Sequence, residues 1–383
     1  MIAGGTARLP DQVELNPDLH SGSELTQLEL LQYIIFAVIK IALLLFILLT
    51  AVAYIVLMER KVIARMQNRW GPNRVGPFGL LQPLADGIKF ILKEDIIPDS
   101  VYKPLYIAAP MIALILSLIS ISIIPFGGDW HIGKYHIPLQ TSAFWNGSGI
   151  QDINIGLLII LGITSLGVYG VALSGWSSNS KYSLLGSLRA SAQLISYELA
   201  LGLSLVGVLL LAGSLSLRQI VDTQAGSPLN WNFFGGLQFI AFFIYIMAAY
   251  AETNRIPFDL PEAETELVAG YHTEYSAMKF AMFFMAEYCN MVTVGCLGTL
   301  LFFGGWHSPF EALHLPVPSI WLLISPLFWF FIKVFIFIFV YIWIRGTLPR
   351  FRYDQLMSFG WKFLLPLSIA NIVVTSLVLA LRS

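Results

Sequence analysis

The chain carries little charge for its length. Only 12% of its 383 residues are charged, 57% are hydrophobic, and the formal net charge is −1. This composition excludes an ordinary soluble domain and is typical of a polytopic helical membrane protein. The near-neutral balance gives no indication of a basic surface for nucleic acid, so no nucleic-acid partner is expected.

Cysteine is also scarce, which excludes several cofactor classes. Cys289 and Cys296 are the two cysteines and lie in one apolar run. On a single helix their Cα atoms would be about 10 Å apart, too far for a disulfide. An iron–sulfur cluster normally needs about four cysteines, and no GxGxxG or Walker pattern follows a clear strand. The sequence therefore predicts no metal, cluster, flavin, NAD or ATP bound by this chain.

Long apolar runs are what the sequence has in abundance. A membrane-spanning helix needs about 20 apolar residues, and about eight runs approach that length. The predicted fold class is therefore all-α, and the short fifth run and long sixth run predict tilted helices. The spans are expected at residues 33–58, 104–125, 154–176, 190–213, 236–251, 276–303, 320–345 and 362–381.

The distribution of Lys and Arg predicts the orientation. Most of these residues fall on one side if the first loop is cytoplasmic, so the positive-inside rule places both termini outside. Residues 1–30 are expected to form a polar, acidic tail without a cleavable signal peptide. Residues 31–383 are expected to form a single membrane domain, with cytoplasmic functional loops at about 59–103 and 252–275.

The first of these loops is rich in cations and turns. Five cations lie between Arg60 and Arg74, two Gly-Pro pairs favour turns, and Trp70 adds an aromatic side chain. A short amphipathic helix should follow, with Pro83 in its first turn, and should lie at the membrane surface. The cations would hold lipid phosphates in one interpretation. The rigid turns and Trp70 favour another, a shaped mouth for an amphipathic ligand.

The second loop concentrates carboxylates at the same membrane face. Arg255 is its one Lys or Arg, and the acids are Glu252, Asp259, Glu262, Glu264 and Glu266, with Glu274 just beyond. Neighbouring like charges repel, so either arginines from the first loop compensate them or some acids stay protonated. A solvated acidic surface is the alternative, but this loop is short and pinned by prolines. Such a cluster suits the handling of protons, cations or a polar headgroup.

Several ionisable residues fall inside the predicted spans. A charge at the bilayer centre costs about 2.5–3.5 kcal/mol, so these side chains should face protein or a cavity. Glu287 and Lys333 could form a structural ion pair or belong to a proton relay, and both interpretations stay open. Lys40 is expected to extend to the interface. The other charged residues of this set are Glu198, Glu252 and Lys279, and the nearby tyrosines that could extend hydrogen-bonded chains are Tyr197, Tyr271, Tyr275 and Tyr288.

Together these features describe a cationic, aromatic mouth beside carboxylates that lead toward the membrane midplane. A ligand that changes its charge or proton demand at the mouth could shift the pKa values of this chain of acids. A quinone fits, because its apolar tail lies in lipid and its polar head takes up protons on reduction. The electrons must then come from a partner.

Several motifs give the chain a specific resemblance, and they cover residues 55 to 370 in order. They are Glu59-Arg-Lys61, Gly71-Pro-Asn-Arg-Val-Gly-Pro77, Leu80-Leu-Gln-Pro-Leu-Ala-Asp-Gly-Ile-Lys89, Gly175-Trp-Ser-Ser-Asn-Ser-Lys-Tyr-Ser-Leu-Leu-Gly186, Ser191-Ala-Gln-Leu-Ile-Ser-Tyr-Glu198, Pro257-Phe-Asp-Leu-Pro-Glu-Ala-Glu-Thr-Glu-Leu-Val-Ala-Gly270, Glu274-Tyr275 and Leu348-Pro-Arg-Phe-Arg-Tyr-Asp-Gln355. With these motifs the chain strongly resembles the H subunits of bacterial NADH-quinone oxidoreductase, the membrane subunits at the arm junction of respiratory complex I.

The resemblance implies roles for particular residues. Quinone-channel residues would be Arg60, Arg69, Trp70, Asp86, Arg255 and Phe258. Proton-coupling residues would be Glu198, Glu252, Asp259, Glu262, Glu264, Glu266, Glu274 and Glu287. Arg350, Arg352 and Asp354 would make contacts in the last cytoplasmic loop. No catalytic residue is expected in this chain, because the headgroup would meet its donors on peripheral subunits.

The resemblance also implies partners and a location. Quinone would be the substrate. The partners would be iron–sulfur subunits of the peripheral arm, other membrane-arm subunits and lipid, in the bacterial inner membrane. Homologous subunits of membrane hydrogenases, deazaflavin-linked dehydrogenases and photosynthetic complexes share much of the motif set and differ in electron donor. A stand-alone cation or proton transporter, and a purely structural anchor, are the remaining alternatives; no inverted repeat supports the transporter.

Overall fold

A computed structural model describes residues 27–127, 130–132, 135–137, 144–146, 149–151, 153–234, 238–259, 270–310 and 319–382. The chain divides into two compact units, residues 1–44 and 45–383. All the cavities and contacts discussed below lie within the second unit.

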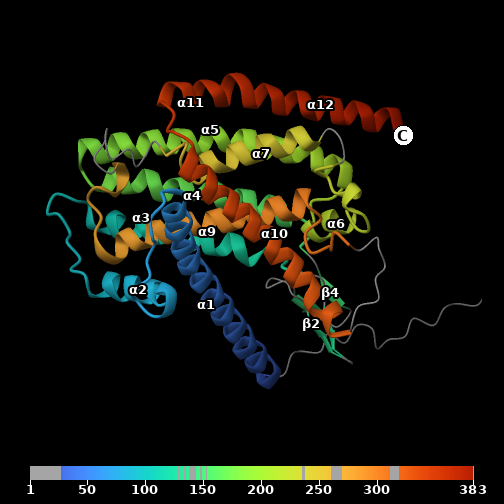
Figure 1. Cartoon of the computed structure of the whole chain (residues 1–383), viewed down its shortest axis with the longest axis horizontal. Helices are drawn as coiled ribbons and strands as arrows, with labels where there is room; N and C mark the ends of the chain where they lie inside the picture. Colours follow the sequence, from blue (N-terminus) through green and yellow to red (C-terminus); the bar gives the residue numbers. More distant parts are fainter. Residues whose placement is uncertain are drawn as a thin grey trace, which may run out of the picture. The chain divides into compact units, whose positions relative to one another are not determined.

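Long helices make up most of the second unit (Figure 1). They are α1 (Gln27–Met66, which begins in the first unit), α3 (Lys103–Ser122), α4 (Gly156–Ser177), α5 (Lys181–Ala212), α7 (Gln238–Glu252), α9 (Ala277–Phe302), α10 (Ser319–Thr347) and α12 (Leu365–Arg382). The short elements are the 3-10 turns Pro77–Gly79, Pro228–Asn230 and Gly270–His272, the helices α2 (Gln82–Leu92), α6 (Leu217–Asp222) and α11 (Tyr353–Phe359), and a π-helical turn, Gly360–Leu364.

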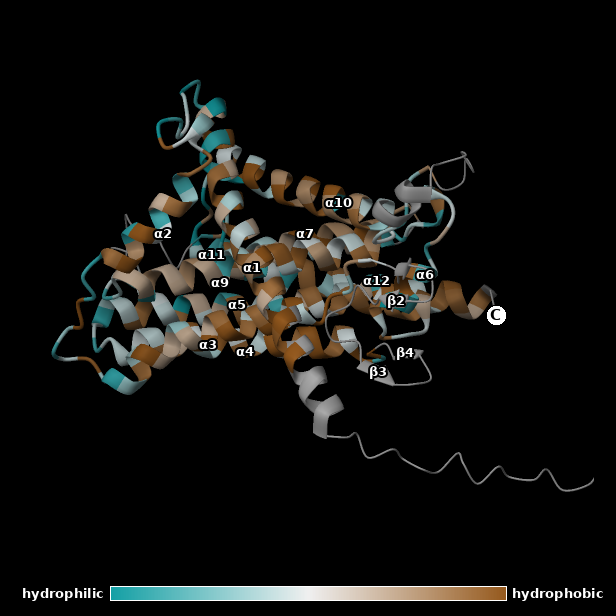
Figure 2. Ribbon diagram, turned by 90° about the horizontal axis from the view of Figure 1, so that it is seen from below, coloured by the Kyte–Doolittle hydropathy of each residue, from teal (hydrophilic) through white to brown (hydrophobic). Residues whose placement is uncertain are grey.

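The helices confirm the predicted polytopic membrane fold. Among the described residues, seven helical segments are long and apolar enough to cross a membrane, and α7 is a shorter apolar helix. Figure 2 shows hydrophobic residues along the long helices and hydrophilic residues in the loops that flank α2. The amphipathic helix lies where the sequence predicted it, because α2 covers Gln82–Leu92, has Pro83 in its first turn and buries none of its residues. Helix α1 continues to Met66, past the predicted end of the first span at residue 58.

The structure also contains two short β-hairpins, which the all-α prediction did not include. Strand β1 (Trp130–Ile132) pairs antiparallel with β2 (Tyr135–Ile137), and β3 (Phe144–Asn146) pairs with β4 (Gly149–Gln151). Each strand has three residues. Runs this short show no alternation that could distinguish a strand from a loop, so residue patterns alone do not predict them.

Small residues let the helices approach closely, as is usual in membrane bundles. A Cβ on Gly170 of α4 would lie 2.9 Å from the Cβ of Ala113 on α3. Similarly, a Cβ on Gly186 of α5 would lie 2.7 Å from the Cα of Gly270. The second contact matters for the site, because Gly270 begins the 3-10 turn that carries Tyr271 and His272.

Helix α7 has 15 residues and is too short to cross a membrane by itself. Before it, Gln224 and Asn232 donate hydrogen bonds to the carbonyls of Leu300 and Leu301, near the end of α9. After it, the chain leaves the helix over residues 253–259, which remain largely buried. Non-helical backbone is tolerated at membrane depth where protein or a water-filled cavity covers it. The unwound end of α7 therefore brings polar and charged side chains into the bundle.

Candidate functional site

A large cavity lies beside the last turns of α1. It has a volume of about 840 Å³ and is lined by Glu59, Arg60, Arg69, Trp70, Arg74, Tyr288 and Arg345, among others. We call it the mouth cavity. The Arg65 guanidinium lies 4.3 Å from the centre of the Trp70 ring, and Arg69 Nε donates to Gln67 Oε1 at 2.7 Å. The structure thus brings the predicted residues Arg60, Arg69 and Trp70 to the wall of one cavity.

A second cavity, of about 200 Å³, lies between α1, α2 and α9. Its lining is mainly apolar and includes Ala53, Leu57, Phe90, Ile91, Met278, Ala281 and Met285. We call it the portal. It shares Val56, Arg60 and Gln82 with the mouth cavity. An apolar passage therefore adjoins a cationic chamber, with Arg60 at their boundary.

An ion pair at this boundary joins α1 to α2. Arg60 Nη1 lies 2.8 Å from Asp86 Oδ2, and Lys89 Nζ lies 3.3 Å from Asp86 Oδ1. Burial raises the pKa of Asp86, but the charges of Arg60 and Lys89 and the hydrogen bonds that the carboxylate accepts outweigh it. The pKa therefore lies below its ordinary value of 3.8. Asp86 is ionised at neutral pH and holds α2 against α1.

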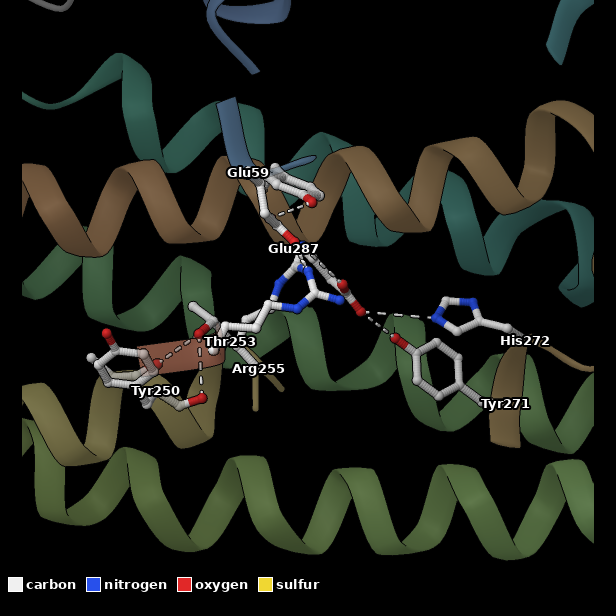
Figure 3. A network of polar contacts seen from close by, with 10 residues as sticks. Glu59, Tyr250, Thr253, Arg255, Tyr271, His272 and Glu287 are labelled. Carbon is white, nitrogen blue, oxygen red and sulfur yellow. Dashed lines mark hydrogen bonds and ion pairs between the residues drawn. The ribbon is translucent and has the colours of Figure 1, made fainter. Parts of the chain in front are cut away.

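The mouth cavity reaches the bundle interior through Glu59. This buried carboxylate accepts a hydrogen bond from the Tyr288 hydroxyl at 2.7 Å and is paired with Arg345 of α10. Its Oε1 also lies 3.9 Å from Arg255 Nη1. Figure 3 shows Arg255 between Glu59 and Glu287, to which its other terminal nitrogen is 3.7 Å distant. Arg255 is therefore shared by two carboxylates on different helices.

A third cavity adjoins Glu287. It has a volume of about 50 Å³, room for a few water molecules, and its polar lining residues include Glu198, Glu252, Asn254, Tyr271, Glu287 and Asn290. We call it the acidic cavity. Helices α5, α7 and α9 each contribute one of the three glutamates. The structure thus brings together the predicted acids of three separate spans.

Glu287 links the acidic cavity to two further groups. The Tyr271 hydroxyl donates to Glu287 Oε1 at 3.0 Å, and His272 Nε2 lies 3.8 Å from the same oxygen (Figure 3). The resulting polar series runs from Tyr288 and Glu59, through Arg255, to Glu287 and the acidic cavity. Because each member is buried in the bundle, a charge change at one end acts on the other with little screening by solvent.

The four tyrosines near the predicted acids divide into two pairs. Tyr271 and Tyr288 donate to Glu287 and Glu59, so they do extend the polar series. Tyr197 instead donates to the carbonyl of Leu356. The Tyr275 ring stacks on Tyr106 with centroids 4.3 Å apart, and burial raises the pKa of Tyr275 to about 12. Tyr197 and Tyr275 therefore contribute to packing.

Other predicted site residues lie elsewhere. Phe258 stacks on Phe351 and lines a separate cavity of about 390 Å³. Asp259 Oδ2 pairs with Arg350 Nη2 at 3.0 Å, which fastens this loop to the last one. Glu274 offers its backbone carbonyl to the Tyr106 hydroxyl. The predicted acids Glu262, Glu264 and Glu266, and the side chain of Lys40, lie outside the described residues.

The suggested Glu287–Lys333 ion pair is wrong. Lys333 Nζ donates to the carbonyls of Phe303, Gly305 and His307 at 2.7, 2.9 and 2.7 Å, and it lies 4.2 Å from the Trp231 ring. The carbonyls that follow a helix C-terminus lack helical partners and carry partial negative charge. The lysine stem is long enough to reach them at the end of α9, so Glu287 pairs with Arg255 instead.

Three central residues are absent from the set predicted by sequence. Glu59 belongs to the Glu59-Arg-Lys61 motif, and its position in the last turns of an apolar span beside cations could have indicated it. Arg345 lies at the equivalent end of another span, where a cation is expected for topology alone. His272 has no local pattern that distinguishes it from a core histidine, and only the packing of its turn on α5 brings it to Glu287.

Comparisons with known proteins identify the family of the chain. Residues 39–376 match the family model described as NADH dehydrogenase. The chain is 69% identical over 351 residues to an NADH-quinone oxidoreductase H subunit (number 2) of Koribacter versatilis, which is 91% of this chain and 98% of the relative. It is 50% identical over 362 residues to an H subunit (number 2) of Geobacter metallireducens, covering 94% and 100%. The H subunit of Leptospira biflexa is 50% identical over 339 residues, covering 88% and 93%.

Proposed function

Because the chain belongs to the NADH dehydrogenase family, among the H subunits of NADH-quinone oxidoreductase, we propose that it forms a quinone channel and couples quinone chemistry to proton movement. Its partners are the other subunits of that membrane complex. In this proposal the iron–sulfur subunits supply electrons, quinone is the substrate, and this chain binds no metal or permanent cofactor.

The observation that carries the proposal is the continuity of the portal with the mouth cavity. The first is lined mainly by apolar side chains, the second has four arginines in its wall, and they share Arg60 and Gln82. A quinone has the matching parts, since its tail is apolar and its head is polar. The tail would occupy the portal while the head passes Arg60 into the mouth cavity.

The buried polar series gives the head a route to act on the acidic cavity. Glu59 and Tyr288 face the mouth cavity, and Arg255 joins Glu59 to Glu287. Reduction of a quinone to a quinol consumes two electrons and two protons, so the demand for protons changes where the head binds. A change at Glu59 alters how strongly Arg255 stabilises the charge on Glu287. Glu287 lines the acidic cavity together with Glu198 and Glu252, so a change in its charge acts on both of them.

The proposal is tested by Glu287→Gln in the assembled complex. The amide keeps the size of the side chain and an acceptor for Tyr271 but cannot ionise. We expect NADH:quinone turnover, proton pumping or both to fall about tenfold or more, since the buried Arg255 loses one of its two carboxylates. Both would be measured in sealed membrane vesicles.

Asp354→Asn is the matched control. It also removes one carboxylate, but Asp354 is exposed, pairs only loosely with Arg352 at 3.8 Å and lines none of the three cavities. A Glu287→Gln complex that assembles fully and keeps both turnover and the proton stoichiometry of the control would remove Glu287 from the coupling path.

A further inference from the structure

The segment that follows α2 is fastened to the start of α9. Lys279 Nζ lies 2.7 Å from Asp95 Oδ2, and the Ile96 amide donates to Ser276 Oγ at 3.0 Å. The Lys279 side chain is 8% exposed and that of Asp95 is 44% exposed. The pair thus joins a buried cation to a carboxylate that retains access to solvent.

The surroundings of Lys279 make this contact specific. Its ammonium lies in the first turn of α9, where the partial positive charge of the helix end opposes a cation. The Tyr106 ring, 5.1 Å away, compensates part of that cost. Asp95 supplies the opposing charge, and a buried ammonium separated from its carboxylate would be strongly unfavourable. The position of Asp95, and of the chain just before it, is therefore held to α9.

Helix α2 ends at Leu92, just before this segment, and has few other anchors. None of its residues is buried, and its earlier half is tied to α1 through Asp86 and Arg60. Its later half carries Phe90 and Ile91, which line the portal, and the Phe90 ring lies 6.5 Å from that of Phe280. Helix α2 thus borders the portal between two ionic anchors, one to α1 and one to α9.

We propose that the Asp95–Lys279 pair is a brace that positions Phe90 and Ile91, and that it thereby makes the portal selective for the tail of the quinone. This inference rests on the proposed quinone channel. With the brace intact, the two side chains form a fixed apolar wall along which a long tail packs. Without it, the later half of α2 moves, and the tail loses contacts that the head does not share.

Substitution of the buried partner gives the cleaner test. Lys279→Met keeps the length and apolar contacts of the stem and leaves Asp95 with solvent as its partner. Arg352→Met is the matched control, because it also removes the cation of an ion pair, here with Asp354 at 3.8 Å, and Arg352 lines neither the portal nor the mouth cavity. Both variants would be studied as assembled complex in native membranes.

Two measurements separate positioning from general damage. Amide hydrogen exchange of peptides covering residues 80–97 reports the mobility of α2. The KM values for a long-tailed quinone and for a short-tailed analogue with the same head report tail contacts. We expect Lys279→Met to accelerate exchange in α2 and to raise the KM for the long-tailed quinone about three- to tenfold, as loss of a few apolar contacts would. The KM for the analogue should not change.

A charge-swapped variant tests the pairing itself. Asp95→Lys combined with Lys279→Asp restores opposite charges and places the acid at the helix start, where it is favoured. It should return exchange and the KM for the long-tailed quinone toward wild type, and it tests the pairing even if Lys279→Met assembles poorly. Unchanged exchange in Lys279→Met, an equal KM change for both quinones, or a swapped pair that restores nothing would each overturn the brace.

Failure of the proposed channel would look different. Ala281→Phe fills the portal without touching the brace. If the assembled Ala281→Phe complex turned over the long-tailed quinone as wild type does, the portal would not be the route, and tail selection there would be overturned with it. A slow Ala281→Phe complex beside an unchanged Lys279→Met complex would instead preserve the channel and reject only the brace.

Discussion

At the scale of single residues, the site depends on two buried carboxylates that share one arginine. Glu59 lies between Arg255 and Arg345, and Glu287 lies on the other side of Arg255. Buried charges are costly unless paired, so removal of one shared partner strands the others. This makes Glu59 as important as the glutamates predicted from the sequence.

We therefore expect Glu59→Gln to lower quinone turnover about tenfold or more in assembled complex, because Arg255 and Arg345 would lose the carboxylate between them. The amide still accepts from Tyr288, so the hydrogen bond alone cannot explain the loss. Turnover and proton pumping would be measured together, with the amount of complex checked on native gels. A Glu59→Gln complex as active as wild type would show that charge at this position is dispensable.

The Asp86 carboxylate predicts a particular pH dependence. Its pKa is lowered by folding, so its stabilising contribution is present above its ordinary value of 3.8 and is lost as pH falls below it. We expect Asp86→Asn to raise the KM for quinone about two- to fivefold, the effect of a partly exposed ion pair. The ratio of mutant to wild-type KM should be constant from about pH 6 to pH 8, where Asp86 stays ionised. A ratio that varied across this range would assign a different titrating group to the effect.

At the scale of helices, the sequence predicts which helices exist better than it predicts where they begin and end. Helix α5 begins at Lys181, before the predicted start at 190, because its first turns bury Ser183, Gly186 and Ser187 against protein and not lipid. A hydropathy profile assigns such small polar residues to loops. For α7 the short apolar run was correctly located, but nothing in its periodicity shows that the chain stays buried after the helix ends at Glu252.

The non-helical residues 253–259 explain why the candidate site could be predicted only in part. The acids Glu198, Glu252 and Glu287 were found because charge inside an apolar run is conspicuous. Their common cavity, and the position of Arg255 between Glu59 and Glu287, result from tertiary packing of residues far apart in the sequence. The same packing turns Phe258 and Asp259 away from the mouth cavity, although they adjoin Arg255 in the chain.

Helix ends also give a test of Lys333. Its ammonium caps three carbonyls that follow α9, so we expect Lys333→Met to lower the temperature at which the complex inactivates by several degrees, because these acceptors would lose a charged donor. Turnover and proton stoichiometry at moderate temperature should stay normal. Inactivation of purified complex would be followed during heating. A variant with normal heat resistance but impaired pumping would instead restore the relay interpretation of this lysine.

At the scale of the whole molecule, the number of crossings decides the orientation of the C-terminus. The seven long segments found among the described residues would, by themselves, leave the two termini on opposite sides of the membrane. If α7 and its unwound extension form an eighth crossing, both termini lie on one side. Gln224, which precedes α7, contacts the end of α9. Asp259, which follows α7, pairs with Arg350 just beyond the end of α10. The chain before α7 and the chain after it therefore lie at opposite ends of neighbouring helices.

We therefore expect eight crossings and, from the cation-rich first loop, an external C-terminus. Alkaline phosphatase is active only outside the cytoplasmic membrane, whereas green fluorescent protein fluoresces inside it. Fused after Arg382, the phosphatase should be active and the fluorescent protein dark, and fusions after Lys93 should give the reverse. The opposite result at Arg382, with the Lys93 control as expected, would mean that α7 does not complete a crossing. The loop with Arg255 would then lie on the side of the membrane away from Glu59, which its contact with Glu59 contradicts.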